Sequence, residues 1–125
     1  IAGPDHSALF LPDIDSWEEW DIWEDGAAMR IEDLIATVDV AYLDATFFAN
    51  GEIPGRDMSG FPHPFITHSM ERFADLPAGE RGKIRFIHFN HTNPVRYPDA
   101  PGRDVVEAAG FNLADEGERI CLADE

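Results

Sequence analysis

The sequence of 125 residues has little cysteine, few basic residues and no long apolar run, and each shortage excludes a class of protein. Cys121 is its single cysteine, so an internal disulfide cannot form and an oxidised, secreted scaffold is not expected. No stretch approaches the roughly 20 apolar residues that a membrane-spanning helix needs. We therefore expect a soluble, cytoplasmic protein without a membrane partner.

Positive charge is also scarce. The chain has 9 Lys and Arg residues against 25 Asp and Glu residues, a formal net charge of −16. A surface of this sign repels polyanions, so nucleic acid is not an expected partner, whereas cations are attracted. The hydrophobic share of 44% is that of a globular protein, and the length suits one domain. The chain should therefore fold around one core.

Apolar segments separated by turn residues predict an α/β fold. The predicted strands cover residues 7–11, 40–43 and 84–87, and the predicted helices cover residues 31–38, 65–76 and 105–109. The spacing of Ser16 and Glu19 is that of a capping box and predicts a further helix start. Two short apolar segments, residues 111–114 and 118–122, flank a turn with Gly117 and predict a terminal hairpin.

Three predicted strands are followed by a side chain that can bind a metal or carry a proton: Asp13, Asp44 and His88. Carboxyl ends of strands are where ligands gather in open α/β sheets, so these residues indicate one site. Histidine with carboxylate suits Zn²⁺, Mn²⁺ or Fe²⁺. Two structural alternatives stay open at this point. Asp13 can begin a turn, and Asp44 can accept backbone N–H bonds from the next loop.

Four blocks of sequence add a resemblance: LFLPDIDSW at residues 9–17, YLDATF at 42–47, PHP at 62–64 and FIHFNHTNP at 86–94. Together they resemble the C-terminal half of a metallo-β-lactamase-fold hydrolase, most closely the group related to coenzyme PQQ synthesis protein B. The resemblance implies an α/β fold, called α+β in some schemes, that forms half of a four-layer αββα sandwich. Residues 1–125 would supply a mixed sheet with helices on one face and a C-terminal hairpin.

The resemblance also implies roles for individual residues. Asp13 corresponds to the family's metal-binding carboxylate, and His88 to its last metal-ligating histidine. Asp44 would orient His63, which would donate a proton to a leaving group. His91 and Asn93 would hydrogen-bond the ligands from behind. The implied cofactor is Zn²⁺, as one or two ions, with Fe²⁺ or Mn²⁺ as alternatives.

One departure from the family pattern is large. The His-x-His-x-Asp-His cluster, which supplies most metal ligands in such hydrolases, does not occur in the sequence. Asp13 and His88 offer two protein ligands, whereas a catalytic zinc generally has three. We therefore expect a fragment that lacks the N-terminal half of its domain, binds metal weakly and is inactive alone. Its uncovered sheet face should favour self-association into a homo-oligomer.

For the intact protein, the resemblance implies a metal-dependent hydrolase whose metal-activated water attacks an ester, amide or phosphoester-type bond of a small molecule. The alternatives are a PQQ synthesis protein B-like enzyme of cofactor biosynthesis, using iron and oxygen, and a non-catalytic remnant of the fold. A phospho-acceptor domain based on Asp44 is a further alternative. Such a domain needs a lysine after a later strand, whereas the single lysine, Lys83, precedes one.

Overall fold

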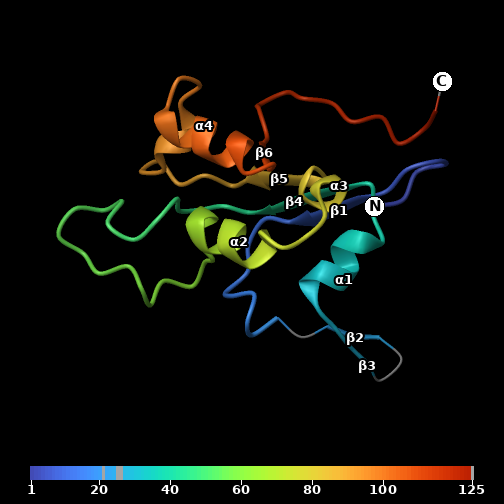
Figure 1. Ribbon diagram of the computed structural model, residues 1–125, viewed down its shortest axis with the longest axis horizontal. Helices are drawn as coiled ribbons and strands as arrows, with labels where there is room; N and C mark the ends of the chain where they lie inside the picture. The colour runs from blue at the N-terminus through green and yellow to red at the C-terminus, as the bar shows by residue number, and fades with distance from the viewer. Residues whose placement is uncertain (21, 25–26, 125) are drawn as a thin grey trace.

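The computed structural model describes residues 1–20, 22–24 and 27–124, with the side chains of residues 22–24, 27 and 28 outside the description. Figure 1 shows the order of the elements along the chain. The strands are β1 (Ala8–Leu11), β2 (Ile22–Glu24), β3 (Ala27–Met29), β4 (Val40–Asp44), β5 (Ile84–Ile87) and β6 (Asn112–Leu113). The helices are α1 (Ile31–Ala36), α2 (Ile66–Phe73), α3 (Ala78–Arg81), the 3-10 turn η1 (Pro94–Arg96) and α4 (Pro101–Ala108).

Four strands form the central sheet in the order β1-β4-β5-β6. All three neighbouring pairs are parallel, and the register places Leu11 beside Leu43, Leu43 beside Phe86, and Phe86 beside Leu113. The predicted α/β class and the three predicted strands are confirmed. The predicted mixing of strand directions is wrong for this sheet, because the antiparallel pair β2-β3 forms a separate two-stranded ribbon.

One face of the sheet carries the core. Residues of β4, β5 and β6 that share this face, such as Leu43, Phe86 and Leu113, are buried. Helices α1, α2 and α4 contribute to the same cluster, with Ile35, Phe73 and Val106 among its members. A strand presents alternate residues to one face, so the buried strand residues named above lie on the same side of the sheet. Helices α1, α2 and α4 cover that side as one layer. The predicted placement of helices on one face is confirmed.

The opposite face is only partly covered. Phe10 is 58% exposed there. Its row continues in register through Tyr42 to Arg85. Glu118 accepts hydrogen bonds on this face from the Tyr42 hydroxyl at 3.0 Å and from Arg85 Nε and Nη2 at 2.8 and 2.7 Å. Side chains therefore attach the C-terminal segment to the sheet.

The predicted terminal hairpin is wrong. Residues 118–122 form no strand, and β6 instead pairs in parallel with β5. The Arg85 guanidinium holds Glu118 through side-chain hydrogen bonds, which lower the pKa of Glu118 from 4.5 to about 2. A charged side-chain contact therefore replaces the backbone ladder that the turn at Gly117 suggested.

The helix predicted to start at Ser16 is also absent, and residues 17–19 form a bend and turn. Ser16 Oγ does accept the expected hydrogen bond from the backbone N–H of Glu19, at 3.1 Å. The Trp17 side chain is buried, however, and its Nε1 donates to Ser69 Oγ of α2 at 2.8 Å. This tertiary contact draws the chain into a tight turn, and a helix does not follow.

The loops that follow β4 and β5 lie at one end of the sheet (Figure 1). Figure 1 shows the N- and C-termini toward the other end, away from the loops that follow β4 and β5. The terminal segments touch, because the backbone N–H groups of Asp5 and His6 both donate to the carbonyl of Leu122, at 3.1 Å. Within the described part of the chain, no helix combines the length and apolar character needed to cross a membrane.

Candidate active site

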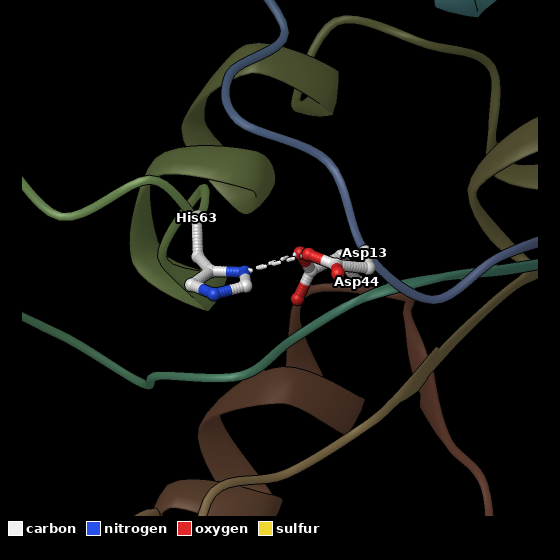
Figure 2. Close-up of side chains that lie close together, drawn as sticks. All are labelled: Asp13, Asp44 and His63. Carbon is white, nitrogen blue, oxygen red and sulfur yellow. Dashed lines mark hydrogen bonds and ion pairs between the residues drawn. The ribbon is translucent and has the colours of Figure 1, made fainter.

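Segments far apart in the sequence converge where the parallel strands end. Asp13 follows β1, Asp44 ends β4, and His88 follows β5. His63 comes from the long loop between β4 and α2. Figure 2 shows Asp13, Asp44 and His63 with their functional groups directed toward one another. The structure therefore brings the predicted site residues to one edge of the sheet (Figure 2), and their function stays a prediction.

Asp44 lies at the centre of the site and is fully buried. Its Oδ2 accepts the backbone N–H of Ile14 at 3.1 Å and lies 2.8 Å from His63 Nδ1. Its Oδ1 accepts the backbone N–H and the hydroxyl of Thr46, at 2.9 and 2.6 Å. The carboxylate is thus surrounded by donors, an arrangement that can hold the His63 ring in one orientation. Because Asp44 is fully buried, a phosphoryl donor has no direct access to it, and the phospho-acceptor alternative is not favoured.

His63 is held on one edge of its ring. Its Nδ1 lies 2.8 Å from Asp44, and the ring packs edge-on against Phe47 at a centroid distance of 5.8 Å. The side chain is 19% exposed. A carboxylate that accepts the Nδ1 proton leaves the Nε2 atom free to take up or release a proton. His63 can therefore act as a general acid or base.

A pocket of about 320 Å³ adjoins this imidazole. Apart from His63, its wall includes Asp15, Glu18, Phe61, Pro64, Phe65 and His68. The long loop after β4 thus supplies both the imidazole and part of the cavity beside it. A small molecule held there would lie within reach of the ring.

Asp13 is the exposed carboxylate of the cluster, with a side chain 69% exposed. Its Oδ1 lies 3.6 Å from His63 Nδ1. One ligand atom each from Asp13, Asp44 and His63 lie within 4.8 Å of one another. Oxygen and imidazole donors at this separation fit an ion such as Zn²⁺, although the bonds around Asp44 leave Asp13 as the available carboxylate.

His88 borders the same cluster from the neighbouring strand. Its Nδ1 lies 3.0 Å from Thr46 Oγ1 and 4.0 Å from Asp44 Oδ1, and its side chain is 48% exposed. The centroids of the His63 and His88 rings are 6.4 Å apart. Asp13 and His88, predicted to ligate one ion, flank the same buried pair, but His88 is not among the described residues whose ligand atoms lie within 4.8 Å of one another. Their roles as ligands stay a prediction, as do those of Asp44 and His63 in proton transfer.

Asn93 and His91 take different positions from those predicted. Asn93 is fully buried, and its Nδ2 donates to the carbonyls of Ala45 and Thr46 at 2.9 and 3.3 Å. It therefore braces the backbone after β4. His91 is exposed, and within the described part of the chain it makes no side-chain hydrogen bond. Neither residue is hydrogen-bonded to His63 or His88.

Sequence reasoning overlooked Thr46, which contacts three of the site's side chains. Its hydroxyl lies 2.6 Å from Asp44 Oδ1, 3.2 Å from His63 Nδ1 and 3.0 Å from His88 Nδ1. A signal was present in the Asp-x-Thr spacing, because a threonine two residues after an aspartate can return its N–H and hydroxyl to that carboxylate.

Comparison with known proteins gives a consistent set of relatives, although no family model matches the chain. Coenzyme PQQ synthesis protein B of Methylobacterium nodulans is 32% identical over 108 residues, covering 78% of this chain and 35% of that protein. The protein of the same name from Methylorubrum populi is 33% identical over the same shares. That of Gluconobacter oxydans is 27% identical over 98 residues, with 74% and 32% covered. The chain thus spans about a third of the length of these relatives.

A solved structure matches the fold. Zn²⁺-bound PqqB from Methylobacterium extorquens superposes with a TM-score of 0.61 at 24% identity. The match covers 89% of this chain and 36% of that one. A parallel sheet with helices on one face is thus shared with a protein of the metallo-β-lactamase fold. Over the region it covers, the chain is therefore homologous to coenzyme PQQ synthesis protein B.

Proposed function

We propose that this chain forms part of the active site of a metal-dependent enzyme of the PQQ synthesis protein B type, acting on a small molecule. The observation that carries the proposal is the buried Asp44 carboxylate, 2.8 Å from His63 Nδ1, with Asp13 and His88 beside it. An oriented imidazole next to two potential ligands is the arrangement that metal-assisted acid–base chemistry requires.

Asp13 and His88 are the residues of this chain that would hold the ion. Both lie at strand ends beside the buried pair, and Zn²⁺ is the proposed ion, with Fe²⁺ and Mn²⁺ as the alternatives. When bound, such an ion lowers the pKa of a coordinated water toward about 7. Two protein ligands are fewer than the three of a catalytic zinc, so further ligands would come from outside this chain.

His63 would move the proton. With its Nδ1 proton held by Asp44, its Nε2 takes a proton in one step and returns it to a leaving group in the next. The Asp44 carboxylate stabilises the imidazolium formed in between, as a buried acid does for a catalytic histidine. The pocket beside the ring, with Phe61 and Phe65 in its wall, would hold the substrate body.

Hydrolysis of an ester, amide or phosphoester-type bond is the reaction that this proton carrier suits best. A second candidate is supported by the relatives, which are named for coenzyme PQQ synthesis. It is a step of cofactor biosynthesis that uses iron and O₂. Both candidates use the same proposed ligands and the same imidazole, and they differ in the ion and in the need for O₂.

The test uses the natural-length protein that carries this sequence. Metal content is measured after purification, and activity is compared with Zn²⁺ under argon and with Fe²⁺ under O₂. Variants His63→Ala and His88→Ala should abolish activity, whereas His6→Ala, a histidine paired with Asp124 near the chain ends, is the matched control. A protein that retains no metal, or an active His88→Ala variant, would contradict the proposal.

A further inference from the structure

The Thr46 hydroxyl lies where three ionisable side chains meet. Its oxygen is 2.6 Å from Asp44 Oδ1, 3.0 Å from His88 Nδ1 and 3.2 Å from His63 Nδ1. A hydroxyl has one proton to donate and two lone pairs to accept with. The destination of that one proton therefore decides what each neighbour can do.

The proton of Thr46 goes to Asp44. An ionised carboxylate accepts hydrogen bonds and donates none, and this contact is the shortest that the hydroxyl makes. Once its proton is committed, Thr46 Oγ1 can only accept from the imidazoles. Any hydrogen bond between Thr46 and His88 must then be donated by His88 Nδ1.

His63 does not depend on Thr46 in the same way. Its Nδ1 lies 2.8 Å from Asp44 Oδ2 and 3.2 Å from the hydroxyl, so the carboxylate is its main partner. For His88, Thr46 is the only hydrogen-bond partner of the ring among the described residues. The nearest carboxylate oxygen, of Asp44, is 4.0 Å away. Among the described residues, Thr46 is therefore the one that can select the tautomer of His88.

We propose that Thr46 is a positioning residue that keeps the neutral His88 ring protonated on Nδ1 and leaves the lone pair on Nε2 for a cation. The hydroxyl also connects His88 to the buried Asp44, which is the arrangement by which carboxylates behind metal-binding histidines fix ring orientation. The tautomer part of this inference stands on its own geometry. The cation part rests on the proposed function.

The first test examines the tautomer in the metal-free chain. The full chain is labelled with ¹⁵N in its histidine rings and studied by long-range ¹H–¹⁵N NMR near pH 8, above the usual histidine pKa of about 6.5. His88 should be protonated on Nδ1. In Thr46→Val, which keeps the side-chain shape without the hydroxyl, a substantial Nε2-protonated fraction should emerge, and Thr46→Ser should restore the original pattern. His6 is the internal control.

The second test titrates the same variants with ZnCl₂. Loss of an outer partner of a ligating histidine weakens metal binding by about 10–100-fold. The Kd of Thr46→Val for Zn²⁺ should therefore be about 10–100-fold higher than that of the unmodified chain, and the Kd of Thr46→Ser should be close to it. If the His88 tautomer changes in Thr46→Val but the unmodified chain does not bind Zn²⁺, the role of Thr46 holds and the proposed metal function is contradicted. If Zn²⁺ binds but Thr46→Val alters neither tautomer nor affinity, the role of Thr46 is overturned. Far-ultraviolet circular dichroism checks folding, and Thr46→Ala replaces Thr46→Val if the latter does not fold.

Discussion

His63 Nδ1 lies 2.8 Å from Oδ2 of Asp44, a carboxylate with no solvent exposure. A buried carboxylate needs donors to offset its desolvation, and here backbone N–H groups, a hydroxyl and an imidazole provide them. We therefore expect the strand end that carries Asp44 to serve both the fold and the proposed chemistry. Variants at this position should affect both stability and activity.

Asp44→Asn should reduce kcat/KM by about 10²–10⁴-fold, because a neutral amide neither fixes the Nδ1 proton of His63 nor stabilises its imidazolium. Steady-state kinetics on the metal-loaded, natural-length protein measure the loss. Asp57→Asn, an exposed aspartate in the same long loop, serves as the control. Activity within a few-fold of the unmodified protein would remove Asp44 from the proposed mechanism.

His88→Ala should raise the Kd for Zn²⁺ by at least about 10-fold, because the variant loses a proposed ligand. Its melting temperature should change little, since the ring is half exposed and makes one hydrogen bond among the described residues. Calorimetric titration and thermal denaturation measure the two quantities. Unchanged Zn²⁺ affinity would assign His88 to the structure alone.

Glu118→Gln should lower the free energy of unfolding by about 1 kcal/mol near neutral pH, the scale of a partly exposed ion pair. The pKa of Glu118 is about 2 in the folded chain against an ordinary 4.5, so its stabilisation is complete above about pH 4.5. It should decline as the pH falls from about 4.5 through 2, and the two proteins should become equally stable only below about pH 2. Urea unfolding at several pH values measures this, with the exposed Glu116→Gln as control. A pH-independent difference would contradict the assignment.

Phe86→Ala should destabilise the fold by about 3–5 kcal/mol, because the ring is fully buried at the centre of the sheet and its removal leaves a cavity. The matched control is Phe10→Ala, a loss of the same side chain at a position that is 58% exposed. It should cost less than about 1 kcal/mol. Equal losses in urea unfolding would show that the two sheet faces are covered alike.

The sequence pattern predicted the helices and strands that are determined by interactions between residues close together in the sequence. The apolar stripe at Ile31, Leu34 and Ile35 lies in α1, and α4 ends shortly before Gly110, whose positive φ of 92° suits glycine. Asp13, Asp44 and His88 could be grouped because strands of a parallel sheet end at one edge. Periodicity and strand topology were sufficient for these features.

The errors arose where a long-range side-chain contact overrode a local signal. The capping box at Ser16 forms its hydrogen bond, yet burial of Trp17 against α2 leaves only a turn. The turn at Gly117 suggested a ladder, yet Arg85, distant in sequence, binds Glu118. Thr46 was overlooked because its importance comes from two histidines that approach it from other segments. Such contacts leave no periodic pattern in the sequence.

The backbone at His88 has a positive φ of 70°, a left-handed conformation that a histidine adopts at a steric penalty. Glycine would relieve that penalty but would remove the ring beside the Asp44 and His63 pair. Selection for heat resistance alone would therefore tend to replace this histidine. Under the proposed function, a lineage that keeps histidine here accepts lower thermal stability in order to keep a metal ligand, so the identity of this residue would indicate whether a homologue retains the proposed activity.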